Sequence, residues 1–229
     1  MKKNKILASL IFLFISFFSN AQNSQENMIQ HKSTQWLLAS MLNEKSNDIE
    51  IIGNPQIVKS PYGDSVLFNG IDTGLFLNRM PLNSLKEFTV EMIFNPAINS
   101  PFEQRILHFG EISGDRMLLE IRAKDTNWYF DGFVASGENK LALIDEKLIH
   151  PLGQWYHVAF VVTANSLTTY VNGKQELQEA YSFKPIKQGK TSIGVRLNQV
   201  SWFKGSIYKI RITPKELKSE EFMPFKQLQ

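Results

Sequence analysis

The stretch Val158-Ala159-Phe160-Val161-Val162 is wholly apolar, and it is followed along the chain by Tyr170-Val171 and then by Asn172-Gly173. A short apolar run bounded by turn residues is typical of a buried strand. Asn-Gly is a strong signal for a tight hairpin, because both central positions of that turn require positive φ. This part of the chain therefore predicts strands joined by a β-hairpin.

The same pattern of short strands continues upstream and downstream. In Phe88-Thr89-Val90-Glu91-Met92-Ile93-Phe94, every second residue is large and apolar, which predicts a strand with one face in the core. Turn signals recur every 8–14 residues, among them Gly53-Asn54-Pro55, Asn69-Gly70, Ser113-Gly114-Asp115, Ser136-Gly137, Gln188-Gly189 and Lys204-Gly205. Many short strands at regular spacing predict an all-β sandwich of two antiparallel sheets.

Composition narrows the class of protein further. A length of 229 residues suits one all-β domain. The chain has no cysteine, which excludes disulfides, thiolate metal sites and a thiol nucleophile. Hydrophobic residues make up 43% of the chain, enough for a substantial core.

The N-terminus has the pattern of a secretory signal peptide. Met1 to Lys5 carries three lysines, Ile6 to Phe18 is apolar apart from serines, and Ser19-Asn20-Ala21 fits a cleavage site. We therefore expect a signal peptide at 1–21 and a protein that is exported, either periplasmic or secreted. No other segment approaches the length of a membrane span, so no membrane insertion is expected after cleavage.

Cleavage would also change the charge of the protein. It removes three of the 25 basic residues and none of the 22 acidic ones, so the mature chain would have no net charge. A nucleic-acid partner would require a surviving basic excess and is not expected. Residues 22–49 are expected to form an N-terminal strap or short helix around the apolar island Trp36–Leu42, and 50–229 the sandwich domain.

The order of several segments resembles laminin-G-like domains of the concanavalin A-like lectin and glucanase superfamily. The segments are Val66–Asp72, Glu87–Glu91, Gly153–Ala159, Tyr170–Gly173, Ser192–Gly194 and Lys204–Ile207. The resemblance covers roughly residues 50–215. It implies a jelly-roll sandwich with one convex and one concave sheet, and a role in binding glycans or proteins or in cleaving polysaccharides.

Several catalytic classes are disfavoured by missing motifs. The superfamily's retaining glucanases carry alternating acids on one strand, whereas Glu120-Ile121-Arg122 has an arginine where the next acid should stand. No nucleophile elbow, phosphate loop or zinc-type His-Glu-x-x-His motif occurs, and the four histidines are scattered. No cofactor and no catalytic metal are expected. The resemblance leaves a structural calcium ion open, with Asp72 as a loop ligand.

Polar residues placed on predicted strands form the candidate site. In Gln104–His108, alternation would put Gln104 and His108 on one face. In the strand ending at Arg122, Glu120 and Arg122 would share a face opposite the apolar residues Leu119 and Ile121.

Two further strands carry the same alternation. Tyr129 and Asp131 would share a face. Thr191–Asn198 is predicted as one strand on which Arg196 and Asn198 share a face with Gly194, and Gly194 would leave room in the floor of a groove. If these strands belong to one sheet, their polar side chains line that groove.

The first hypothesis is an enzyme that performs β-elimination, as a lyase or dehydratase, on uronic-acid-containing oligosaccharides in polysaccharide degradation. Arg122 and Arg196 would clamp the carboxylate and acidify the adjacent C–H. His108 or Tyr129 would remove the proton, and Tyr129 or Glu120 would protonate the leaving oxygen. Gln104, Asp131, Asn198 and Trp202 would complete the substrate-binding set with the two arginines.

The second hypothesis is a non-catalytic glycan-binding module. Arginine, asparagine, aspartate and an exposed tryptophan such as Trp202 also suit hydrogen bonding and stacking on a sugar. A third is an adhesion or protein-interaction domain. There is also an alternative in which these residues form no site. Glu120 and Arg122 could equally belong to a cross-strand ladder of ion pairs on a solvated face.

Overall fold

The computed structural model describes residues 32–44 and 46–227 of the chain. The predicted signal peptide at 1–21 lies outside the described residues. Residues 34–229 group into one compact unit, to which the description below is confined.

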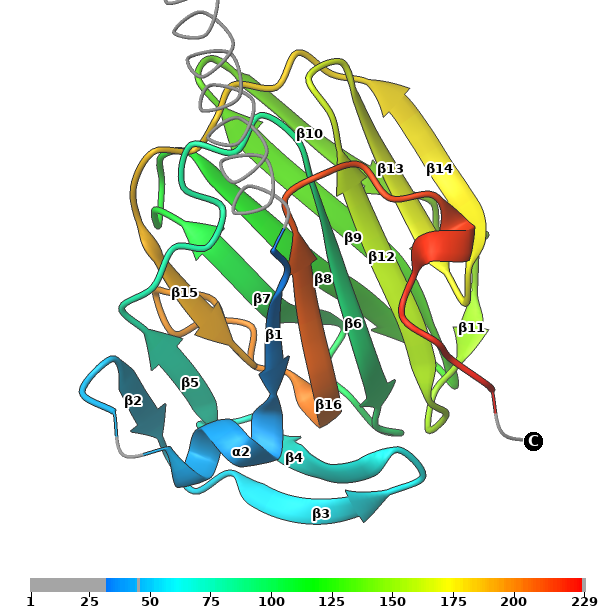
Figure 1. The fold of residues 1–229 in the computed structure, drawn as a ribbon. Coiled ribbons are helices and arrows are strands. Elements are labelled where there is room, and N and C mark those ends of the chain that lie inside the picture. Colours follow the sequence, from blue (N-terminus) through cyan, green and yellow to red (C-terminus); the bar gives the residue numbers. More distant parts are fainter. Residues whose placement is uncertain (1–31, 45, 228–229) are drawn as a thin grey trace, which may run out of the picture. The chain divides into compact units, whose positions relative to one another are not determined.

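The unit is a sandwich of two antiparallel sheets, which confirms the predicted all-β fold (Figure 1). Sheet A has eight strands, in the order β14 (Lys174–Ala180), β13 (Ser166–Val171), β12 (Tyr156–Val162), β6 (Phe88–Pro96), β16 (Lys204–Thr213), β4 (Gly63–Asn69) and β3 (Gln56–Ser60), with β1 (Thr34–Leu37) also paired to β16.

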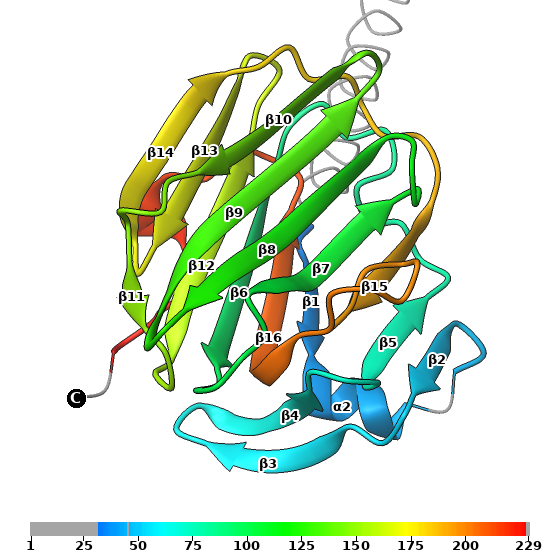
Figure 2. The ribbon, with the colours of Figure 1, turned by 180° about the vertical axis from the view of Figure 1, so that it is seen from behind.

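Sheet B also has eight strands and is seen from its outer side in Figure 2. Its order is β10 (Asn139–Ile144), β9 (Asn127–Ser136), β8 (Arg116–Lys124), β7 (Glu103–Gly110), β15 (Lys190–Ile193), β5 (Gly74–Leu77) and β2 (Ile49–Ile52), with β11 (His150–Pro151) paired to β9.

The hairpin around Asn172-Gly173 forms as its sequence predicts. Strand β13 ends at Val171 and β14 begins at Lys174, and these two residues pair across the turn. Asn172 and Gly173 both have positive φ, 51° and 78°. This is the turn that matches the right-handed twist of the flanking strands.

The core lies between the sheets and is built from the alternation in the strands. Val90, Met92 and Phe94 of β6 are fully buried against sheet B. The ring of Phe94 meets that of Trp128 edge-on, with centroids 5.3 Å apart. Trp128 has no exposed surface and is therefore a core residue.

The apolar island near the N-terminus contains both a strand and a helix. Trp36 and Leu37 belong to β1, and α2 (Leu38–Asn43) follows directly. Leu38 and Met41 of α2 are buried in the same core. No helix among the described residues is long and apolar enough to span a membrane.

The segment 214–227, here called the C-terminal strap, runs over the outer face of sheet A (Figure 1). It includes a short 3-10 turn, η1 (Ser219–Glu221). Its side chains Leu217 and Phe222 form a second apolar cluster with Ala159 and Val161 of β12. The strap therefore covers one outer face of the sandwich.

Candidate functional site on the outer face of sheet B

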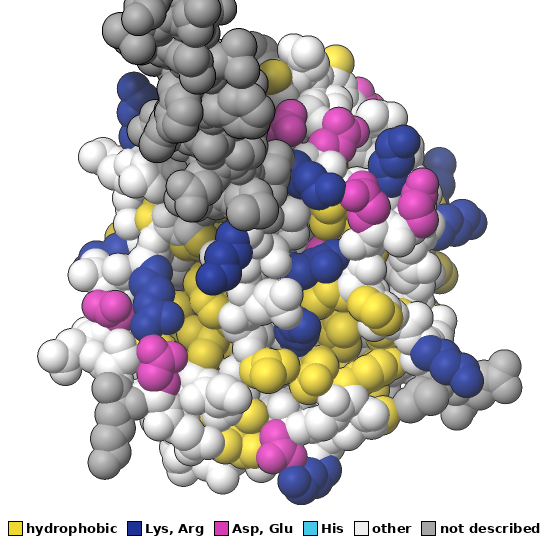
Figure 3. Space-filling view, viewed as in Figure 1, with side chains coloured by type: hydrophobic (Ala, Val, Ile, Leu, Met, Phe, Trp, Pro, Cys, Tyr) yellow, Lys and Arg dark blue, Asp and Glu magenta, His cyan; other side chains and the backbone are white. Residues whose placement is uncertain are grey.

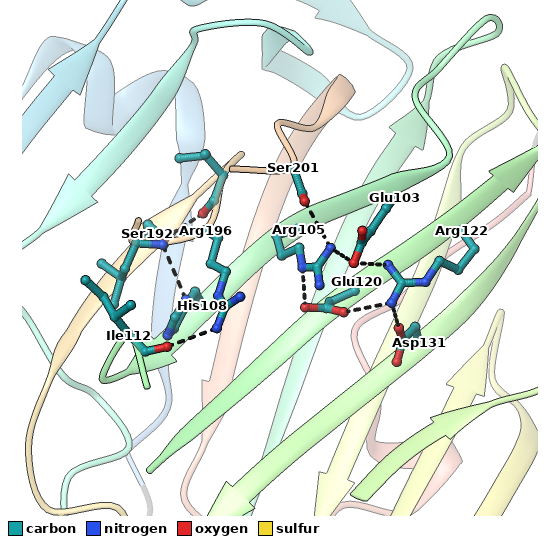
Figure 4. A network of polar contacts seen from close by, with 12 residues as sticks. Glu103, Arg105, His108, Ile112, Glu120, Arg122, Asp131, Ser192, Arg196 and Ser201 are labelled. Atoms are coloured by element: carbon teal, nitrogen blue, oxygen red, sulfur yellow. Dashed lines mark hydrogen bonds and ion pairs between the residues drawn. The ribbon is translucent and has the colours of Figure 1, made fainter. Parts of the chain in front are cut away.

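Five charged side chains form a continuous network on the outer face of sheet B (Figure 4). They belong to three adjacent strands, where Glu103 pairs with Arg122, Arg105 with Glu120, and Glu120 with Asp131. The inward neighbours Leu119 and Ile121 are buried in the core. We call Glu103, Arg105, Glu120, Arg122 and Asp131 the ionic network.

Both arginines of the network are committed to carboxylates. Arg122 lies 2.6 Å from Asp131, 3.0 Å from Glu103 and 3.5 Å from Glu120. Arg105 contacts Glu103, reaches Glu120 at 2.7 Å and donates a hydrogen bond of 3.0 Å to the Ser201 hydroxyl. Neither guanidinium is left free to clamp a ligand carboxylate.

The two buried acids of the network hold their protons unusually well. Burial and, after it, the neighbouring Asp131 carboxylate raise the pKa of Glu120 to about 7, against the opposing effect of Arg105 and Arg122. Burial also raises the pKa of Asp131, against the pull of Arg122. Two neighbouring carboxyls share one proton at pH values below about 7, and there the remaining two negative charges balance the two arginines.

One predicted alternation is wrong because of a β-bulge in β7. The register against β8 shifts between Arg105 and Leu107, so Ile106 is the extra residue. Gln104 therefore does not share a face with His108. It is fully buried, donates to the Pro101 carbonyl and accepts from the Lys204 amide, which is a structural role. Arg105 takes the outward position instead.

The predicted strand over Thr191–Asn198 is also wrong. Strand β15 ends at Ile193, and Gly194 has φ of 81°. A side chain on Gly194 would collide with the Phe68 ring at 2.4 Å, so the residue must be glycine for packing as well. Arg196 and Asn198 consequently lie in a loop that folds back toward β7, with Arg196 donating to the Ile112 carbonyl at 3.0 Å.

His108 faces outward on β7, but its imidazole is enclosed. The Glu111 carbonyl accepts from Nε2 at 2.9 Å, and the Leu197 amide donates to Nδ1 at 3.3 Å. Because a carbonyl can only accept, Nε2 carries the proton and Nδ1 is the acceptor. Burial lowers the pKa of His108 to about 4, so the ring is neutral and both nitrogens are occupied.

The predicted site residues therefore divide into separate groups. Figure 4 places His108 and Arg196 beside β15, apart from the ionic network. Trp202 is half-buried near Gly74 of β5, where an added Cβ would lie 3.3 Å from its ring. Asn198 is exposed in the loop. The expected single groove containing His108, Arg196 and Tyr129 is not formed.

Tyr129 instead lines a pocket at the end of the β8–β9 hairpin, here called the Tyr129 pocket. Its volume is about 300 Å³, and its walls also come from the turn and from the segment after β10. Tyr129 lies directly across from Arg122 of the ionic network. The remaining lining residues are Lys124, Asp125, Asn127, Glu146, Lys147 and Ile149.

Several of these residues could not be selected from the sequence. Arg105 and Glu103 enter the network only because the bulge at Ile106 turns Arg105 outward. Asn127 and Lys124 flank the turn at Asp125, whose φ of 56° marks a tight turn. The one local signal for this part of the pocket was the run of polar residues between two strands.

A metal centre is not indicated in the described part of the chain. No group of three or more histidine, cysteine, aspartate or glutamate side chains there is arranged to hold an ion. Asp72, the candidate calcium ligand, accepts a 2.7 Å hydrogen bond from the Asn69 amide within its own loop.

A family model for laminin-G-type domains, described as concanavalin A-like lectin/glucanases superfamily, matches residues 69–222. The chain belongs to this family. The match confirms the resemblance carried by the strand segments. No curated protein matches the chain.

Solved structures with the same fold have different roles. Domain 4 of AbnA, an extracellular arabinanase from Geobacillus stearothermophilus, in complex with arabinotriose, is 20% identical with a TM-score of 0.59, covering 74% of this chain and 79% of that one. The receptor binding domain of botulinum neurotoxin D is 17% identical with a TM-score of 0.57, covering 76% and 45%. A mutant NanB sialidase from Streptococcus pneumoniae is 18% identical with a TM-score of 0.55, covering 69% and 27%. These similarities show the fold alone.

Proposed function

We propose that this laminin-G-like domain binds glycans without cleaving them, and that the Tyr129 pocket is the binding site. The observation that carries the proposal is the lining of the pocket. An aromatic side chain, an amide and two lysines converge there with two carboxylates on a hollow of about 300 Å³. Such a set suits hydrogen bonding to sugar hydroxyls beside an apolar contact.

The relatives support binding as the general role. The AbnA domain was solved with arabinotriose, and a botulinum neurotoxin binding domain was solved with SialylT. Transfer of this property to the present chain rests on a shared fold, so the lining residues have to carry it.

The charges of the site favour a neutral sugar over a uronate. The guanidiniums of Arg105 and Arg122 are each held by carboxylates. The pocket itself contains two lysines, Lys124 and Lys147, and two acids, Asp125 and Glu146. The two lysines and two acids balance each other in charge, so the pocket offers no net positive charge to an acidic sugar.

The second candidate is the β-elimination enzyme acting on uronic-acid-containing oligosaccharides. Its support is Glu120, whose pKa of about 7 suits a proton donor, on the strand next to Tyr129. His108 has no role in it, because both ring nitrogens are occupied. A glycosidase is disfavoured, since Glu120 and Asp131 both reach one nitrogen of Arg122 and leave no room for a sugar between them.

We also propose that the protein acts outside the cytoplasm and that residues 1–21 direct its export. Expression of the full chain in a bacterial host, followed by mass measurement of the exported product, should give an N-terminus at Gln22. A product that retains Met1 and stays in the cytoplasm would contradict export.

Binding is tested by calorimetry with arabinotriose, xylotriose, mannotriose, cellotriose and trigalacturonate. We expect a neutral trisaccharide to bind, and Asn127→Ala to weaken it at least tenfold. Asn139→Ala is the matched control, because Asn139 also flanks a sheet B turn but is outside the pocket. Tyr129→Phe isolates the hydroxyl. Unchanged affinity in Asn127→Ala and Tyr129→Phe would rule out this pocket.

The same samples separate binding from elimination. β-Elimination would generate an unsaturated uronate, which absorbs in the ultraviolet, from trigalacturonate. We expect no such absorbance. Its appearance, together with its loss in Glu120→Gln, would replace the binding proposal with the enzyme.

A further inference from the structure

A second pocket lies on sheet A, where the strand beside β16 changes. Strand β4 pairs with Lys204–Ile207 of β16, and β1 pairs with Lys209–Ile212. Tyr208 falls between these two pairings, at an irregularity in the register of β16 against β6. Neither β1 nor β4 pairs with Tyr208, so β16 has no strand neighbour on that side at this residue.

This second pocket, here called the Tyr208 pocket, has a volume of about 250 Å³. It is bounded by β1 and α2 on one side and by the β3–β4 hairpin on the other. Leu37, 42% exposed, supplies an apolar wall. Figure 3 shows hydrophobic side chains gathered in the lower part of this face of the molecule.

Tyr208 supplies the aromatic ring of the pocket, and one edge of this ring is accessible. Tyr208 packs against Tyr62, with ring centroids 5.9 Å apart and planes tilted by 35°. Next to it stands Gly63, where a Cβ would approach to 3.2 Å from the Tyr208 ring. The absence of a side chain at Gly63 leaves that edge of the ring accessible.

Three polar side chains of different kinds reach the same pocket. Ser40 and Asn43 of α2 are exposed, and the Asn43 amide nitrogen donates to the Ala39 carbonyl at 3.2 Å, which leaves its carbonyl oxygen as an acceptor. Asp64 is paired with Lys59 at 2.6 Å. The pocket thus offers a hydroxyl, an amide oxygen and a charge-balanced carboxylate.

We propose that the Tyr208 pocket is a second carbohydrate site, which takes one neutral sugar residue. A partly exposed tyrosine ring can contact the C–H face of a sugar, while the hydroxyl, amide and carboxylate bind its hydroxyls. The negative charge of Asp64 is balanced by Lys59, so it does not favour an ionic ligand.

The two pockets lie on different sheets, so one short oligosaccharide cannot occupy both. The protein is then bivalent and can bridge neighbouring polysaccharide chains, with a gain in avidity. This proposal extends the proposed function but depends on different residues.

The test is calorimetry on the whole protein with the neutral trisaccharides named above. Two trisaccharides should bind per chain. Ser40→Trp fills the Tyr208 pocket from an exposed position and should reduce the stoichiometry to one. Ser113→Trp is the matched control, because Ser113 is exposed in a turn of sheet B away from both pockets. Asn43→Ala should weaken the same site at least threefold without adding bulk.

The outcomes distinguish the two sites. One bound trisaccharide, lost in Asn127→Ala and unaffected by Ser40→Trp, overturns the second site and keeps the first. One bound trisaccharide, lost only in Ser40→Trp, overturns the Tyr129 pocket and keeps the second site. Two bound trisaccharides, neither affected by Ser40→Trp, also overturn the second site. The absence of any binding overturns both.

Discussion

Each outer face of the sandwich has a buried glutamate near its centre, and the two glutamates are in opposite states. On sheet A, Glu91 is fully buried and ionised, because Arg211, His157 and the Met223 amide lower its pKa despite burial. On sheet B, Glu120 is 2% exposed, and burial beside a second acid raises its pKa to about 7. A buried glutamate is therefore an ionised partner of cations on sheet A and a proton-holding acid on sheet B.

The difference follows from what covers each face. Glu91 accepts from the Met223 amide at 2.6 Å, so it anchors the C-terminal strap. Phe222 of the strap packs on the rings of His157 and Tyr170. The centre of sheet A is thus occupied by the chain's own residues. Among residues 32–44 and 46–227, no segment comparable to the strap crosses the outer face of sheet B (Figure 2), and the Tyr129 pocket is open to solvent.

The largest expected effect comes from removing the anchor of the covered face. Glu91→Ala leaves Arg211, 2.5 Å from the lost carboxylate, and His157 without their partner. Breaking a buried ion pair on one side costs about 3–5 kcal/mol. Urea unfolding should show this loss relative to wild type. A loss below about 1 kcal/mol would mean that the strap does not depend on Glu91.

A matched pair of phenylalanines tests the cover itself. Phe222 of the strap is 8% exposed, whereas Phe133 is half-buried on the outer face of sheet B, where the Arg116 guanidinium lies 5.0 Å from the centroid of its ring. Phe222→Ala should lower the free energy of unfolding by about 3 kcal/mol and Phe133→Ala by about 1 kcal/mol. Equal losses in urea unfolding would show that the two faces are equally buried in solution.

The opposite pKa shifts predict opposite effects of pH on stability. The pKa of Glu120 is higher in the folded protein, so its contribution is present below its unfolded value and is lost as pH rises toward 7. The pKa of Glu91 is lower in the folded protein, so its contribution is lost as pH falls below the unfolded value. Each group changes the slope by at most about 1.4 kcal/mol per pH unit.

Unfolding free energies measured from acid to neutral pH check this assignment. Glu120→Gln should flatten the fall of stability between pH 5 and 7, and Glu91→Gln should flatten the fall on the acid side. A wild-type slope near pH 6 that survives in Glu120→Gln would assign that titration to a different group.

The sequence predicts these faces well where strands are regular. Alternation in the strand carrying Glu120 and Arg122 is correct, because β8 pairs without interruption with β9. It fails at Gln104, because the bulge at Ile106 changes which side chains point outward. It fails again after Ile193, because Gly194 in the left-handed region ends the strand.

Contacts between distant parts of the chain are harder to foresee. Arg105 is positioned by Ser201, and Glu91 by the amide of Met223. Each of these contacts depends on the path of a loop or of the strap across a sheet. A local pattern of polar and apolar residues contains no information about that path, so the ionic network and the anchor could only be found from the structure.

The smallest expected effect is that of Glu120→Gln at pH 6. Glu120 holds the proton shared with Asp131 at that pH, so a neutral glutamine can replace it as donor to Asp131 and as acceptor from Arg105. We expect a change in unfolding free energy below about 1 kcal/mol, against a loss of several for Glu91→Gln, whose ionised carboxylate a neutral amide cannot replace. Because an ionised Glu120 would make the two losses similar, the ratio between them reports directly on whether the open face carries its proton.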